Sequence, residues 1–148
     1  MNIIEKDIED WARSSIPAYQ FMDVTVISVS NGLYKCVIPL NKNTGNHINT
    51  VHAAFQWAAA EMLGGLIVLT KRSSKQYVPV IRSLDIEFMR PAFTDISSEA
   101  FFSEQDVEKM NSAMKNNGRY DFELSSTIKN TDGEVVAKAK GTYAVRIM

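Results

Sequence analysis

Apolar and polar residues alternate along much of this chain, and one long apolar run interrupts the alternation near the middle. Alternation with a period of two is typical of strands that bury one face. It is found in six stretches: 21–29, 33–40, 77–90, 96–102, 120–128 and 135–147. Asn31-Gly32 joins the first two stretches, and the turn at 130–133 joins the last two. Both are typical of hairpins.

A polar segment begins at Asn46. The apolar run follows this segment and continues to Leu69. We predict a helix here, capped by Asn49 or Thr50. Its length is close to the roughly 20 residues that span a membrane, but His52, Gln56 and Glu61 favour a buried core helix. A helix that is apolar on nearly every side must be covered all round. We therefore expect a sheet to wrap one side of it and a second protomer or the N-terminal helix to cover what remains.

Other segments complete the predicted order. Residues 1–16 carry an apolar stripe of Ile4, Ile8, Trp11 and Ala12, which predicts an amphipathic helix laid over the domain edge. Residues 105–117 are predicted as a polar helix or a wide loop. Within 77–90 we expect four side chains to face the core: Ile81, Leu84, Ile86 and Phe88. The order predicts a single α+β domain over 1–148, with a curved antiparallel sheet of five to six strands around one long buried helix.

Two glycines, Gly64 and Gly65, lie late in the predicted helix. Glycine inside a helix costs about 1 kcal/mol relative to alanine. Such residues are explained by the close approach of another element, and we therefore expect a dimer.

Composition narrows the function without identifying it. The formal net charge of -1 gives no overall attraction to nucleic acid or an anionic membrane. The one cysteine, Cys36, excludes an intrachain disulfide and fits a reducing compartment, and its strand position favours a small core residue. The acidic N-terminal segment does not resemble a signal peptide, so we expect a soluble, cytoplasmic protein. The two histidines have no metal-ligand spacing, so no metal site is expected.

The acid in the apolar helix is the main chemical signal. A carboxylate among apolar side chains is costly unless a partner satisfies it. Glu61 lies nine residues after His52, which turns the helix by about 180°, so the two cannot enter one pocket of one protomer. The same geometry places Ala54, Ala58, Glu61 and Gly65 on one face of the helix.

The spacing Asn46-x-x-x-Thr50-x-His52-x8-Glu61 resembles the hotdog-fold acyl-CoA thioesterases of the phenylacetic-acid-degradation type. The segment from Leu84 to Ala92 is similar to that superfamily's strand ending in Arg-Pro-Ala. Where the family has His-Gly-Gly, this chain has His-Ala-Ala, so it resembles most closely an uncharacterised branch. The resemblance implies a hotdog fold and a thioester hydrolase with its site at a dimer interface.

Helix starts present unpaired N–H groups, so those of Ala53 or Ala54 are candidates to stabilise an oxyanion. Glu61 would be the general base or the nucleophile, and the resemblance implies that it reaches the site from the facing protomer. Asn46 and His52 would shape the site, and the expected substrate-binding residues are Thr50, Gln56, Ala58 and Arg90. The expected substrate is an acyl-CoA or a related acyl thioester, with coenzyme A as part of the substrate and no separate cofactor. The expected assembly is a homodimer or a dimer of dimers.

Alternatives stay open from the sequence. Glu61 could be a structural acid, His52 could orient the loop, and Asn46 could be an ordinary loop residue. The whole protein could bind an acyl ligand without hydrolysing it. A hotdog dehydratase fits less well, because those sites pair a histidine with an acid and this helix places the two on opposite faces.

Overall fold

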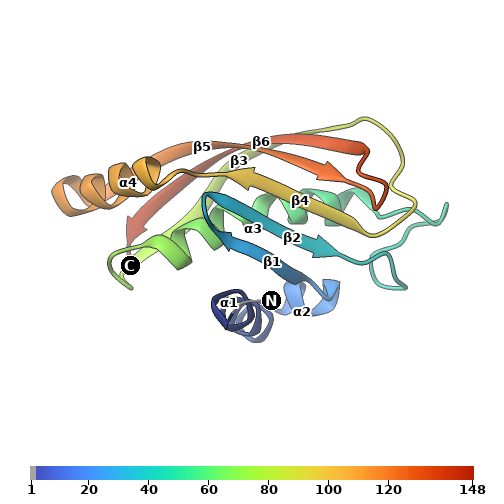
Figure 1. The fold of residues 1–148 in the computed structure, drawn as a ribbon, viewed down its shortest axis with the longest axis horizontal. Helices are drawn as coiled ribbons and strands as arrows, with labels where there is room; N and C mark the ends of the chain where they lie inside the picture. The colour runs from blue at the N-terminus through green and yellow to red at the C-terminus, as the bar shows by residue number, and fades with distance from the viewer. Residues whose placement is uncertain (1–2) are drawn as a thin grey trace.

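One antiparallel sheet curves around a long central helix in the computed structural model, which describes residues 3–148 (Figure 1). The six strands lie in the spatial order β1-β2-β4-β5-β6-β3. The elements are α1 (Ile3–Ser15), α2 (Pro17–Met22), β1 (Thr25–Ser30), β2 (Leu33–Ile38), α3 (Ala53–Lys71), β3 (Tyr77–Phe88), β4 (Ile96–Phe101), α4 (Glu104–Asn117), β5 (Arg119–Lys129) and β6 (Val135–Ile147). The predicted α+β fold is therefore confirmed.

The central helix α3 rests on the concave face of the sheet. Its sheet-facing side is buried and includes Met62, Leu63 and Ile67. Its other side, with Ala54, Trp57 and Ala58, is partly or fully exposed. By length and composition α3 could cross a membrane, but half of its residues are buried inside this domain. The helix is thus covered on one side by its own sheet and left accessible on the other.

The two helix glycines meet different surroundings. A Cβ atom added at Gly64 would lie 2.2 Å from Cε1 of Tyr143, whose ring therefore packs directly against the helix at this point. A Cβ atom added at Gly65 would meet nothing within 4 Å. The close approach that we predicted is therefore made at Gly64, by β6 of the same chain, and Gly65 leaves open space beside the helix.

This difference predicts that glycine-to-alanine substitutions at the two sites have opposite effects on the free energy of unfolding. Gly64→Ala should lower the free energy of unfolding by about 1–3 kcal/mol, because the methyl group would displace the Tyr143 ring. Gly65→Ala should raise it by about 0.5–1 kcal/mol, because alanine favours the helix and has room. Urea unfolding of both variants checks this, and equal effects at the two sites would contradict it.

Helix α1 covers one edge of the sheet, and its packed face is partly apolar and partly acidic. Glu5 and Glu9 are turned inward and are 2% and 6% exposed, whereas Ile4 is 63% exposed. Glu9 accepts a hydrogen bond from the N–H of Val26 at 2.7 Å, and Glu5 accepts one from Val29 at 3.2 Å. Of the predicted apolar stripe, Ala12 is buried and Ile8 packs against the core, whereas Ile4 and Trp11 are exposed. The packed face therefore combines half of the stripe with two carboxylates, because the edge of β1 presents unpaired N–H groups that carboxylates satisfy.

The opposite edge of the sheet is not covered. Strand β3 is twelve residues long and pairs with β6 on one side. Among residues 3–148, no strand pairs with its other side. Val80, Phe88 and Met89 are 44–50% exposed along this strand and just beyond it. A long, unpaired strand edge of this kind is a ready site for another strand.

Three local predictions are corrected by the structure. Residues 21 and 22, predicted as the start of a strand, instead end the helix α2, which begins at Pro17 because its missing N–H costs nothing in the first turn of a helix. His52, not Asn49 or Thr50, caps α3. Phe88 is exposed instead of facing the core, because it lies at the end of the unpaired edge strand, while Ile81, Leu84 and Ile86 are partly buried.

Candidate active site

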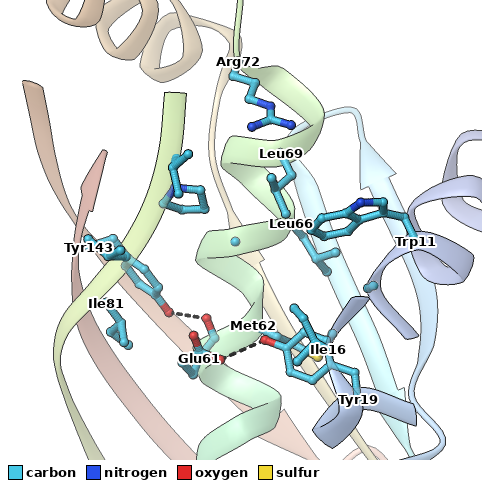
Figure 2. A pocket seen from close by; sticks show the side chains of 15 residues that line it. Trp11, Ile16, Tyr19, Glu61, Met62, Leu66, Leu69, Arg72, Ile81 and Tyr143 are labelled. Atoms are coloured by element: carbon cyan, nitrogen blue, oxygen red, sulfur yellow. Dashed lines mark hydrogen bonds between the residues drawn. The ribbon is translucent and has the colours of Figure 1, made fainter. Parts of the chain in front are cut away.

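An apolar pocket of about 330 Å³ lies beside the middle of α3 and contains Glu61 (Figure 2). We call it the acid pocket. Its walls come from α1, α2, α3, β3 and β6, and the side chains are mainly apolar: Trp11, Ile16, Met62, Leu66, Leu69, Val78 and Ile81. Gly65 also lines it, and Arg72 lines the end furthest along the helix from Glu61. A carboxylate is thus held at one end of a largely apolar space.

Two tyrosines hold Glu61 in place. The hydroxyl of Tyr19, on α2, donates a hydrogen bond to Oε2 of Glu61 at 3.0 Å. The hydroxyl of Tyr143, on β6, donates instead to the backbone carbonyl of Glu61 at 2.9 Å (Figure 2). Burial raises the pKa of the Glu61 carboxyl above its ordinary value, and the Tyr19 hydrogen bond opposes that rise. Glu61 therefore has the environment of a tuned acid–base group.

The loop before α3 is braced by its own side chains. Nδ2 of Asn46 donates to the hydroxyl of Thr50 at 2.8 Å, and Oδ1 of Asn46 accepts from the Thr50 N–H at 3.0 Å. His52 then caps the helix, with Nδ1 accepting from the N–H of Ala54 at 3.0 Å. Asn46 and His52 are thus positioning residues for the start of the helix.

One N–H group at this helix start has no partner. The Ala54 N–H donates to His52, and the N–H groups of Phe55 and Gln56 donate to the His52 carbonyl. Within residues 3–148, no acceptor bonds to the N–H of Ala53. Of the two donors that we proposed for an oxyanion, Ala54 is occupied and Ala53 is available.

A second, more open pocket of about 410 Å³ surrounds this helix start. We call it the helix-start pocket. It brings together five of the predicted site residues and the end of β3, and its lining includes Asn46, Thr50, Ala53, Gln56, Arg90, Phe88 and Met89. Glu61 is not part of it. In a single chain the acid and the helix start therefore belong to two separate pockets, as the helix geometry predicted.

Two of the remaining candidates, Gln56 and Arg90, have structural partners. Gln56 is buried and donates to the Val51 carbonyl at 3.0 Å, and Ala58 lies partly exposed on the accessible side of α3. Arg90 pairs with Glu134, and two bases of β3 and β6 are paired as well: Arg82 with Asp121 and Lys140 with Glu123. For Lys138 no ion pair is found among residues 3–148.

The two tyrosines that bond to Glu61, Tyr19 and Tyr143, were not identified from the sequence. Tyr19 is 42 residues from Glu61 along the chain and belongs to a helix that the pattern did not reveal. A tyrosine two residues after a proline carries no recognisable signal by itself. Tyr143 had one indirect signal in the sequence, because a glycine inside the helix, Gly64, indicates that a bulky group approaches α3 closely.

Neither a metal-binding cluster nor a reactive thiol is found among residues 3–148. Within the described chain, residues 3–148, no group of three or more His, Cys, Asp or Glu side chains could hold a metal ion. Cys36 is fully buried beside Ser98, and burial raises its pKa to about 12. The prediction that Cys36 is a core residue is thus confirmed, and Glu61 is the group best placed for chemistry.

Comparison with known proteins supports the fold. Residues 9–145 match a family profile described as a domain of unknown function, DUF4442. A protein of unknown function from Pseudomonas aeruginosa, described as a thioesterase candidate, has a TM-score of 0.85 at 23% identity, over 97% of this chain and 96% of that one. No curated protein sequence gives a significant match.

Other similar structures are of thioesterases. One from Haemophilus influenzae has a TM-score of 0.76 at 13% identity, over 99% of this chain and 93% of that chain. A thioesterase from Staphylococcus aureus has a TM-score of 0.71 at 12% identity, over 88% of this chain and 98% of that one. These likenesses show the hotdog fold predicted from the sequence. The S. aureus protein was crystallised with a Gln→Ala and with a Glu→Ala substitution, fifteen positions apart.

Proposed function

Because this chain belongs to the DUF4442 domain family and shares its fold with thioesterases, we propose that it hydrolyses an acyl-CoA or a related acyl thioester. The observation that carries the proposal is Glu61, a carboxylate held by a hydrogen bond at one end of an apolar pocket. An apolar space suits an acyl chain, and a carboxylate suits activation of water. Asn46 and Glu61 are fifteen residues apart, like the two residues substituted in the S. aureus thioesterase.

The complete site would need two protomers. Val78 to Ile81, at the start of β3, line the acid pocket, whereas Phe88 to Arg90, at its far end, line the helix-start pocket. From Val80 to Met89 an extended strand covers about 30 Å, so the two pockets of one chain lie far apart along this strand.

A twofold pairing of two β3 edges would bring them together. If the pairing is antiparallel and centred between Leu84 and Asp85, Val80 of one protomer lies opposite Met89 of the other. The acid pocket of one protomer then adjoins the helix-start pocket of its partner. The uncovered edge of β3 and the accessible side of α3 both support this homodimer.

The chemistry follows from the two halves. Glu61 would take a proton from water as the water oxygen bonds to the thioester carbon, and the Ala53 N–H would stabilise the negative charge that develops on the carbonyl oxygen. When the carbon–sulfur bond breaks, Glu61 would return the proton to the departing sulfur. The products are a carboxylic acid and a free thiol. The only co-reactant is water.

A panel of acyl-CoA substrates tests the activity. Release of coenzyme A can be followed with a thiol-detecting reagent, over chain lengths from acetyl to palmitoyl and with aryl groups. Turnover of at least one member above the uncatalysed rate is the expected result. Absence of turnover across the panel, together with an acyl ligand retained on native mass spectrometry, would favour a protein that binds acyl groups without hydrolysing them.

Mixed dimers test whether the site is shared. Chains inactivated by Glu61→Gln and chains inactivated by Ala53→Pro should regain activity when refolded together. Statistical mixing puts half of the chains in heterodimers, and each heterodimer would have one intact site of two, so about a quarter of wild-type activity is expected. Each variant refolded alone is the control. Activity that stays at the level of the controls would place both groups in one protomer.

A further inference from the structure

The hydrogen bond between α2 and the acid suggests a role for a residue outside the motif. We propose that Tyr19 is the positioning residue of Glu61, holding its carboxylate in the orientation and in the ionised form that hydrolysis requires. This inference rests on the proposed thioesterase function. Tyr19 would not touch the reacting atoms. It would act through Oε2 of Glu61, 3.0 Å from its hydroxyl, and leave Oε1 free to face water.

The placement of Tyr19 is built into the fold. Pro17 starts α2, Met22 is buried in the core, and Asp23 ends the helix in the left-handed conformation with φ 58°. Arg13 of α1 binds the C-terminal end of α2. Its guanidinium donates to Gln20 at 2.9 Å and to Asp23 at 2.6 Å. A short helix fixed at both ends presents the Tyr19 ring to the pocket in one position.

The other groups near Glu61 cannot take this role. Tyr143 from β6 donates to backbone carbonyls, those of Ala60 and Glu61, and not to the carboxylate. Arg72 lines the other end of the pocket and donates to the carbonyls of Lys75 and Tyr77. Cys36 from β2 is buried as a neutral thiol.

The remaining walls of the pocket carry no charge close to Glu61. Helix α1 contributes Trp11 and Ala12, and β3 contributes Val78 to Ile81. None of these side chains titrates. Among the described residues that line the pocket, Tyr19 is therefore the one side chain that donates to the carboxylate.

The consequence has a definite direction. A hydrogen bond to the ionised carboxylate favours that form, and burial disfavours it. Removing the Tyr19 hydroxyl leaves burial unopposed, so the pKa of Glu61 should rise. A base with a raised pKa is protonated over a wider pH range, and the acid limb of the kcat/KM profile should move to higher pH.

The test compares Tyr19→Phe with Tyr143→Phe, which removes a hydroxyl from the same pocket without touching the carboxylate. Carbon-13 NMR of protein labelled at the glutamate carboxyl carbons gives the titration of Glu61, and the signal missing from Glu61→Gln assigns it. We expect the Glu61 midpoint to shift to higher pH in Tyr19→Phe and to stay at the wild-type value in Tyr143→Phe.

Activity provides the second readout. We expect the acid limb of kcat/KM in Tyr19→Phe to shift in the same direction as the NMR midpoint, with activity recovering at high pH. A loss of kcat that is equal at all pH values, or an unchanged Glu61 midpoint, would overturn the inference. If the midpoint shifts but even the wild type hydrolyses no thioester, the failure is that of the proposed function, because the NMR readout does not depend on turnover.

Discussion

Replacing Glu61 by glutamine should lower kcat by roughly 10²–10⁴-fold, the usual contribution of a general base. Glutamine keeps the size of the side chain and can still accept the Tyr19 hydrogen bond, but it cannot take a proton from water. The substrate would still meet the same apolar walls, so KM should change little. Steady-state kinetics on the best substrate of the acyl-CoA panel measure both constants.

The same substitution should stabilise the fold at neutral pH. Because burial raises the pKa of Glu61 above its unfolded value, the folded state holds this proton more tightly than the unfolded state does. The stability that this difference contributes is fully present below the unfolded pKa and is lost as pH rises through the folded pKa.

Glutamine does not ionise and avoids that loss. Glu61→Gln should therefore be more stable than wild type near pH 7. The free energy of unfolding should rise by about 0.5–2 kcal/mol, a typical gain when a residue that serves activity at the expense of stability is replaced. The difference should disappear near pH 4. Thermal unfolding of both proteins at several pH values checks this. Full activity in Glu61→Gln, or a lower stability at pH 7, would contradict a buried catalytic base.

Replacing Ala53 by proline should lower kcat by about 10²–10³-fold, the usual cost of losing one oxyanion donor. Ala53 is the first residue of α3, where proline is well tolerated because its missing N–H has no helical partner. His52, before it, has φ -60° and ψ 142°, an extended conformation that suits a residue preceding proline. The variant would remove one hydrogen-bond donor from a helix start that is otherwise intact.

Ala53→Gly is the matched control. It keeps the N–H and removes only the methyl group, so it should retain activity. Thermal midpoints of both variants should lie close to wild type, as expected for an exposed first turn. If Ala53→Pro folds normally and keeps its full kcat, the oxyanion must be stabilised by a different group.

The fold was largely predictable because its two kinds of element carry different periods. Residues 77–88 and 135–147 alternate with a period of two, and α3 is apolar over nearly its whole length. The errors occur where backbone groups, not apolar burial, decide the structure. Glu5 and Glu9 face inward because the edge of β1 offers N–H donors, and no hydrophobic pattern records that requirement.

The candidate site was predictable only in part, for a similar reason. Glu61 stood out because a carboxylate in an apolar helix demands a partner, and the spacing from His52 showed that the two could not meet in one chain. The partner, Tyr19, could not be predicted, since its helix is six residues long and its contact spans 42 positions. His52 became a cap because its ring nitrogen reaches the Ala54 N–H, a detail of local geometry.

The unequal edges of the sheet have a consequence for how large an assembly can grow. If two chains join through β3, the continuous sheet has twelve strands and ends at β1 on both sides. At each end, the carboxylates of Glu5 and Glu9 accept hydrogen bonds from N–H groups of β1 that another strand would need. Helix α1 would thus block further strand pairing at β1, and an assembly that forms through the sheet would stop at two chains. A chain that lacked α1 would have two bare edges, the condition for open-ended, fibre-like association instead of a closed pair.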